Sequence, residues 1–185
     1  MILFYIITIL ILILSLLGTI YVTIYNNLKE KLLKKKQAES EIDQTLREKY
    51  DILSKIKTIL NTNLKGKDAI NLDTLTKMEK ITEDKLTSFE FYRSLIDFEN
   101  KMIKIRENAK KMTSTKDFEI EMEKIEDINV KLSGEIRYYN DVISSYMKMY
   151  SKFPGNIISK TSRLKELKYF DNKNLDDNIE KDFQI

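Results

Sequence analysis

The stretch FEIEMEKIEDINVKLSGEIRYYNDVISSYMKMYSKF, residues 118–153, decides the fold, because its apolar residues recur at alternating intervals of four and three. This heptad spacing predicts one continuous helix that buries a single seam, as in a coiled coil. Ser114 or Thr115 is suited to cap its start, and Pro154-Gly155 is expected to end it. The seam comprises Phe118, Met122, Ile125, Asn129, Leu132, Ile136, Tyr139, Ile143, Tyr146, Tyr150 and Phe153.

Two seam features admit more than one interpretation. Asn129 is polar, and such a residue either fixes helix register or belongs to a polar site inside the bundle; we favour the first, because no supporting neighbours are evident. The seam tyrosines predict a core whose hydroxyls reach the rim, rather than an aromatic patch for a ligand. Gly134, which costs about 1 kcal/mol in a helix, suggests a close helix crossing.

Apolar stripes predict three further helical segments. The first continues from the N-terminal segment through Leu28 and Leu32 and ends at a turn over residues 61–71. Its stripe comprises Ile42, Leu46, Leu53, Ile56, Leu60 and Leu64.

A second segment begins near a capping box at Thr76 and Glu79 and ends around Met112. Its stripe comprises Leu75, Met78, Leu86, Phe89, Ile96 and Ile103. The third is a short helix over residues 157–170, with Ile157, Thr161, Leu164 and Leu167.

The sequence thus predicts an all-α protein: an N-terminal transmembrane helix, then an antiparallel up-and-down bundle of three long helices and one short helix. We divide the chain into a transmembrane anchor (1–25), a helical bundle (26–170) and an acidic, flexible tail (171–185). The tail carries five acids and two lysines, a net charge of −3.

Residues 1–25 contain no charged side chain and no proline, and about 20 apolar helical residues suffice to cross a bilayer. A cleaved signal peptide is disfavoured, because no basic residue precedes the run, the run is too long and no small-residue cleavage site follows. Aromatic residues suit the two headgroup layers. They are Phe4 and Tyr5 at one end, and Tyr21 and Tyr25 at the other.

Five lysines against one acid follow the anchor, giving a local net charge of +4. Positive flanks stay cytoplasmic, so we expect the N-terminus outside the cell membrane and the bundle inside. The cluster serves topology first; anionic lipid headgroups are a further candidate partner. The lysines are Lys29, Lys31, Lys34, Lys35 and Lys36.

Composition restricts the chemistry. The 185 residues include no cysteine, histidine or tryptophan, which excludes Cys/His zinc sites and His-dependent triads. No long single-sign block argues for nucleic acid. An acidic stretch early in residues 118–153 lies off the seam and is read as a solvated face favoured by the helix dipole, rather than as a metal site. The stretch contains Glu119, Glu121, Glu123, Glu126 and Asp127.

Three stretches carry a family resemblance. The anchor closes on Tyr25-Asn26-Asn27-Leu28, and Ala38-x-Ser40-x-Ile42-Asp43 continues to Leu46-Arg47-x-x-Tyr50-Asp51-Ile52. The most specific stretch begins at Arg137-x-Tyr139-Asn140-Asp141 and continues through Tyr146, Phe153-Pro154-x-Asn156-Ile157-Ile158 and Tyr169-Phe170. In these the chain resembles a divergent member of the LemA family. The resemblance implies a single-pass membrane protein with an antiparallel cytoplasmic helical bundle. It departs from the family pattern at Glu39, Ser54-Lys55, Met147 and Ser159.

Arg137, Tyr139, Asn140 and Asp141 form either a binding surface or a structural motif. We favour the second, with Asn140 and Arg137 bonding to the turn near Asn156 or to a neighbouring helix.

We assign no catalytic, cofactor-binding or metal residue and expect no enzyme activity and no cofactor. The leading hypothesis is a membrane-anchored interaction or scaffold module with an unidentified protein partner. The alternative is a regulatory or sensory protein that couples membrane state to a partner.

Overall fold

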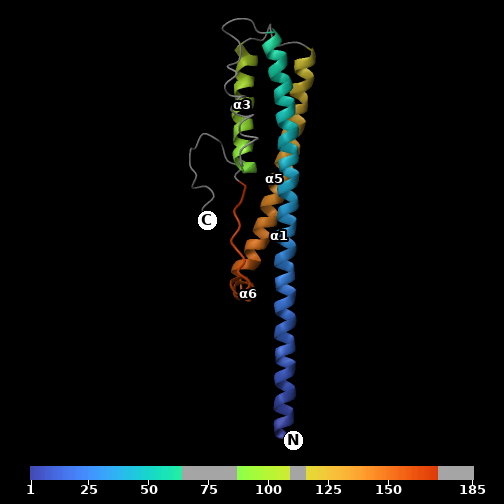
Figure 1. Cartoon of the computed structure of the whole chain (residues 1–185), viewed down its shortest axis with the longest axis vertical. Coiled ribbons are helices and arrows are strands. Elements are labelled where there is room, and N and C mark those ends of the chain that lie inside the picture. Colours follow the sequence, from blue (N-terminus) through green and yellow to red (C-terminus); the bar gives the residue numbers. More distant parts are fainter. Residues whose placement is uncertain (64–86, 109–115, 171–185) are drawn as a thin grey trace.

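The computed structural model describes residues 1–63, 87–108 and 116–170. Its longest element, α1 (Ile2–Asn63), is one helix of 62 residues (Figure 1). No break occurs at Asn26-Asn27, so the boundary expected after residue 25 lies inside this helix. The N-terminal part of α1 projects alone, and the remainder forms one side of the bundle (Figure 1).

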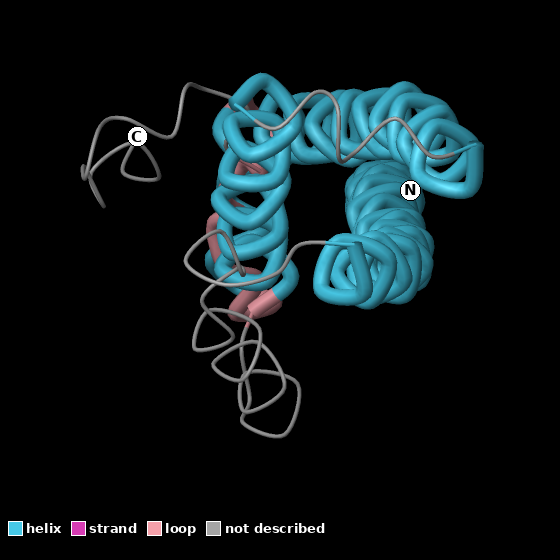
Figure 2. Tube along the Cα trace, turned by 90° about the horizontal axis from the view of Figure 1, so that it is seen from above, coloured by secondary structure: helices cyan, strands magenta, loops and turns pink. Residues whose placement is uncertain are grey.

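Three other helices complete the described fold: α3 (Ser88–Asn108), α5 (Lys116–Ser151) and α6 (Gly155–Thr161). The described residues therefore confirm the predicted class of three long helices and one short helix. Figure 1 shows α5 running opposite to α1 and α3, which run the same way. Seen along the long axis, the helices surround a common centre (Figure 2). The turn after residue 63 and the Thr76/Glu79 cap lie outside the described residues, as does the 171–185 tail.

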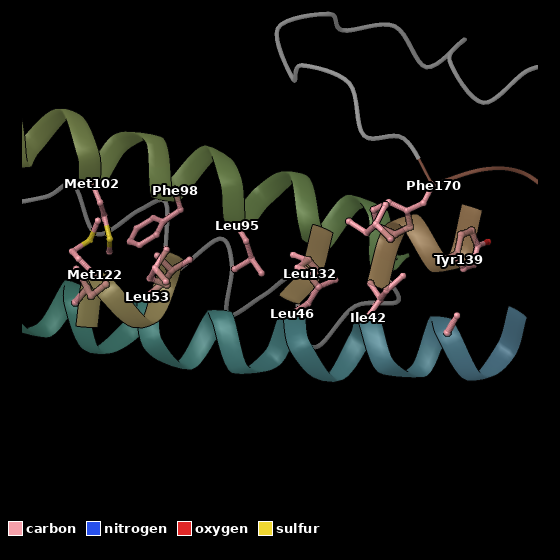
Figure 3. Close-up of a cluster of buried hydrophobic side chains, with 14 of the residues drawn as sticks. Ile42, Leu46, Leu53, Leu95, Phe98, Met102, Met122, Leu132, Tyr139 and Phe170 are labelled. Carbon is pink, nitrogen blue, oxygen red and sulfur yellow. The ribbon is translucent and has the colours of Figure 1, made fainter. Parts of the chain in front are cut away.

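Buried side chains from α1, α3 and α5 meet in one core (Figure 3). The α1 stripe is confirmed, since Ile42, Leu46, Leu53, Ile56 and Leu60 are all buried. Eight of the predicted α5 seam residues are buried as well. They are Phe118, Met122, Ile125, Leu132, Ile136, Tyr139, Ile143 and Tyr146. The coiled-coil geometry of this seam stays a prediction.

The buried face of α3 is rotated from the expected stripe. Leu95, Phe98 and Met102 form its centre, whereas Phe89 and Ile103 are only partly buried at its edge. The start of α3 is fixed by a capping box, in which the Thr87 amide donates to Glu90 Oε2 and the Glu90 amide donates to Thr87 Oγ1, at 2.9 and 3.4 Å.

Three further predictions were wrong. Phe153 lies beyond α5 and is 79% exposed rather than in the seam. Gly134 marks no helix crossing, because a β-carbon there would meet nothing within 4 Å. The short helix is Gly155–Thr161, with Ile157 exposed, and residues 164–170 are not helical.

A Schellman motif ends α6. Arg163 adopts a left-handed backbone conformation with φ of 53°, the Arg163 amide donates to the Lys160 carbonyl, and the Leu164 amide donates to the Ser159 carbonyl. The usual glycine is replaced here by arginine, so the sequence carried no signal for this helix end.

Candidate functional site

A buried polar cluster joins the three long helices at the middle of the bundle. Lys49 Nζ lies 2.6 Å from Glu99 Oε2 and donates to Asn129 Oδ1 at 2.7 Å. The Asn129 amide in turn donates to Glu99 Oε1 at 2.8 Å. The three side chains thus form a closed ring with one member from α1, α3 and α5. The Lys49 side chain is 1% exposed and that of Glu99 13%.

Asn129 therefore has supporting polar neighbours on α1 and α3, which were not evident from the sequence. Lys49 stands three residues after Leu46 and four before Leu53, where the helical spacing would place an apolar residue. This gap in the apolar stripe is the sequence signal for a buried polar side chain. A cavity of about 260 Å³ borders the ring. Its lining comprises Lys49, Tyr92, Ile96, Glu99, Asn100, Asn129, Leu132 and Ser133.

Two further polar links connect α1 to α5. Buried Thr45 donates its hydroxyl to Glu135 Oε1 at 2.9 Å, and exposed Lys131 pairs with Glu48 at 3.0 Å. Burial raises the pKa of Glu135 despite the Thr45 hydrogen bond. The hydrogen bond from Lys131, followed by that from Gln44, lowers the pKa of Glu48. The surroundings therefore shift the pKa of Glu135 upward and that of Glu48 downward.

The Arg137–Asp141 motif holds the extended segment 164–170 against α5. The Asn140 amide donates to the Phe170 carbonyl at 3.0 Å, and the Phe170 amide donates back to Asn140 Oδ1 at 2.7 Å. The structural role favoured for Asn140 is therefore found, but its partner is Phe170 rather than the turn near Asn156. Arg137 and Asp141 are exposed.

Two seam tyrosines continue this attachment. The Tyr139 hydroxyl donates to the Lys168 carbonyl at 3.4 Å, and the Tyr146 hydroxyl donates to the Lys165 carbonyl at 2.8 Å. Burial raises the pKa of each to about 12, so both remain protonated donors at neutral pH. The rings are buried with their hydroxyls bonded at the rim, as the sequence predicted.

Aromatic side chains close over the end of this segment. The Phe170 ring lies edge-on to Phe89, Tyr92 and Tyr139, with centroids 5.6, 5.5 and 6.1 Å away. Edge-to-face pairs at these separations are favourable. Phe170 therefore anchors the extended segment to both α3 and α5.

The acidic stretch of α5 lies mostly at the surface. Glu119, Glu123, Glu126 and Asp127 are exposed, as expected for a solvated helix face. Glu121 differs: it is 14% exposed and bonds to Lys124 at 2.6 Å. It also borders a cavity of about 430 Å³ together with Lys55 and Asp117.

The lysines after the apolar segment do not behave alike. Lys34 pairs with Glu30 and Lys35 with Glu39, each at 2.6 Å along α1. Lys29 lies over the Tyr25 ring, 5.5 Å from its centroid, and Lys36 is exposed. Two of the five positive charges are thus balanced by neighbouring carboxylates.

The end of the bundle near these lysines has its own apolar cluster. Leu28, Tyr146 and Ile158 are buried together, with Ile24 and Tyr25 packed against them. Below this level α1 emerges without cover, and residues 1–23 are all exposed. Within the described residues, α1 is a helix long and apolar enough to cross a membrane, and none of its apolar window is buried.

These features define an all-helical protein whose bundle shares its longest helix with a candidate membrane span. A family model described as the LemA family matches residues 38–183. Because the match covers most of the chain, the protein belongs to the LemA family. The match includes the second and third resemblance stretches, whereas Tyr25–Leu28 precedes it. A search of curated proteins found no match.

Proposed function

We propose that this LemA-family protein is a non-enzymatic, single-pass membrane protein whose helical bundle is an interaction module at the inner face of a cell membrane. The observation that carries the proposal is that α1 is at once an uncovered apolar helix and a structural part of the bundle. Any protein that binds the bundle is thereby held at the membrane.

The chemistry of the described interior supports a structural rather than a catalytic role. The Lys49–Glu99–Asn129 ring is closed on itself, so each of its charged groups is occupied in joining helices. A catalytic lysine or carboxylate must be free to act on a substrate in a pocket, whereas Lys49 and Glu99, which line the cavity of about 260 Å³, are paired with each other.

Crosslinking in native membranes tests the interaction role. A photoreactive group at exposed Tyr138 on α5 should crosslink to a defined heterologous protein, and the same group at Leu10, inside the apolar segment, should not give that product. Recovery of self-crosslinked chains alone from both positions would contradict the proposal.

The orientation is part of the proposal. Five lysines follow the apolar segment within residues 29–36, which favours a cytoplasmic bundle. C-terminal fusions to one reporter active only outside the membrane and to another active only inside should give the inside signal. The opposite result would reverse the topology and change the class of accessible partners.

Anionic lipid is a proposed partner of the juxtamembrane lysines. At about 1.5 Å per residue, Lys29 and Lys31 lie within about 10 Å of the level of Tyr25, whereas Lys36 lies about 16 Å beyond it. Interactions with headgroups weaken over a Debye length of about 8–10 Å. Lys29 and Lys31 are therefore the better placed for lipid.

The continuity of α1 favours a regulatory protein as the second candidate function. A helix unbroken across Asn26-Asn27 can transmit a displacement or rotation from membrane to bundle. A flexible glycine linker inserted between these residues should abolish such signalling. A phenotype that survives the insertion would remove this candidate.

A further inference from the structure

The turn between α5 and α6 is held beside α1 at the level where the helix becomes uncovered. The hydroxyls of Tyr21 and Ser162 lie 3.0 Å apart, so α6 reaches down to Tyr21. Ile24 lines a cavity of about 280 Å³ together with Phe153, Pro154 and Gly155 of the turn. In Figure 1, α6 is the part of the bundle that lies nearest the N-terminus.

The length of the uncovered helix fixes where this turn stands relative to a bilayer. Residues 2–20 rise about 28 Å at about 1.5 Å per residue, close to the roughly 30 Å of a hydrocarbon core. When these residues span the core, the turn at the level of Tyr21–Ile24 falls in the interfacial layer on the bundle side.

The outer surface of the turn is apolar. Phe153 is 79% exposed and Ile157 is 55% exposed, although Gly155 and Ile158 between and beside them are buried. Among the large apolar side chains described beyond residue 25, Phe153 is the most exposed. Aromatic and aliphatic side chains at the tip of a turn are suited to enter the headgroup and upper acyl region.

Charge around the turn matches an anionic surface. Residues 148–163 contain four basic side chains and no acid. All four are exposed. They are Lys148, Lys152, Lys160 and Arg163. Basic residues around an apolar tip increase affinity for membranes that contain anionic lipid.

We infer that the α5–α6 turn is a second membrane contact of this chain: Phe153 and Ile157 insert into the interface of the bilayer that α1 spans, with the four basic residues at headgroup level. The inference rests on the proposed membrane span of α1. It assigns to Phe153-Pro154-x-Asn156-Ile157 the task of seating the bundle on the lipid.

Depth-dependent quenching in the reconstituted full-length protein tests the inference. The chain has no cysteine, so single cysteines at Phe153, Ile157, Val130 and Leu17 can each carry one environment-sensitive fluorophore. Val130 is the matched control, because it is 75% exposed on α5 but lies far from the turn. Leu17 reports the membrane span itself.

In vesicles with a quencher fixed at headgroup depth, labels at 153 and 157 should lose severalfold more fluorescence than the label at 130. The difference should increase when phosphatidylglycerol replaces part of the phosphatidylcholine. Quenching at 17 by a deep quencher, together with equal, weak quenching at 153 and 130, would overturn the inference and leave the membrane span intact. Absence of quenching at 17 would instead refute the span.

The main alternative occupant of this surface is a second copy of the chain. Disulfide formation between Phe153→Cys chains, with no lipid quenching at 153, would show that contact and overturn the inference.

Discussion

Lys49 occupies a position at which the α1 stripe would otherwise place an apolar side chain. Its ammonium is buried against Glu99 and Asn129, so the position remains polar through contacts from two other helices. Burying such a pair has a large desolvation cost, but removing one partner leaves the other charge uncompensated. We therefore expect the ring to constrain how the three helices align more than it adds stability.

We predict that Lys49→Met lowers the free energy of unfolding by about 3–5 kcal/mol, the cost typical of breaking a buried pair. Urea unfolding of the detergent-solubilised chain measures it. Lys131→Met, which breaks the exposed pair with Glu48 between α1 and α5, should cost less than about 1 kcal/mol. Recovery of stability when Glu99→Met and Asn129→Leu are added would confirm desolvation as the cause, and equal losses in the two single variants would contradict it.

The opposite pKa shifts of Glu135 and Glu48 predict opposite effects of pH on stability, although both side chains link α1 to α5. Burial raises the pKa of Glu135, so its contribution to stability is most favourable at acid pH and is lost as pH rises through the raised value. Glu135→Gln should therefore be more stable than the parent chain at pH 7, and this advantage should vanish on acidification. Urea midpoints across a pH series measure the difference.

Glu48 is the control. Its pKa is lowered by the hydrogen bond from Lys131, so Glu48→Gln should lose stability at pH 7 and converge with the parent at acid pH. If Glu135→Gln and Glu48→Gln change the stability in the same direction at pH 7, the opposite pKa shifts of the two carboxyls are refuted.

At the scale of elements, the extended segment 164–170 is held by side chains rather than by a helix or sheet. Asn140 supplies a donor and an acceptor to the same residue, Phe170, in the manner of a backbone pair. This explains why the segment need not be helical: its carbonyls at Lys165, Lys168 and Phe170 receive hydrogen bonds from α5.

Asn140→Ala should release the end of this segment, because two hydrogen bonds to Phe170 are lost together. Hydrogen exchange at the Phe170 amide should become at least about tenfold faster, as expected for a loss of roughly 1.4 kcal/mol or more. Asp141→Ala is the control, since Asp141 is exposed. Unchanged exchange in Asn140→Ala would show that the aromatic contacts of Phe170 suffice.

Substitution by alanine is expected to have opposite effects on stability at two glycines, Gly155 and Gly134. A β-carbon at Gly155 would collide with the Met149 carbonyl oxygen, so Gly155→Ala should destabilise the junction of α5 and α6 by about 1–3 kcal/mol. Gly134 stands in open space within α5, and Gly134→Ala should stabilise by up to about 1 kcal/mol. Thermal unfolding of both variants provides the comparison, and destabilisation by Gly134→Ala would contradict the open environment.

Periodicity predicted the elements better than the contacts between them. In α5 eight of the eleven predicted seam residues are buried, and the sequence missed Val142, which is buried beside the seam. In α3, Leu95, Ile96, Phe98, Met102 and Ile103 supply two adjacent apolar stripes, and only packing against α1 and α5 selects the buried one.

The candidate site was harder to predict, because its members come from different helices. The gap at Lys49 was visible in the sequence, but nothing local connects it to Glu99, fifty residues away. Residues 164–170 carry a helical spacing that the arginine turn and the α5 hydrogen bonds override.

At the scale of the molecule, we expect the bundle to keep its stability without the uncovered part of α1. The two buried clusters draw no residue from positions 1–23, so the bundle does not rely on them for burial. Removing residues 2–20 should therefore yield a soluble chain with a nearly unchanged urea midpoint. Removing residues 2–32 should lower it, because Leu28 is lost from the second cluster. A collapse of stability in the shorter deletion would contradict this separation.

The unbroken course of α1 fixes the distance between the bilayer and the distal end of the bundle. From Tyr25 to Asn63 the helix rises about 57 Å at about 1.5 Å per residue, several times the Debye length of about 8 Å at physiological ionic strength. The end of α1 near Asn63 is therefore electrostatically independent of the headgroups. A protein that docks there would meet the same stand-off whatever the lipid composition, while the opposite end remains sensitive to it.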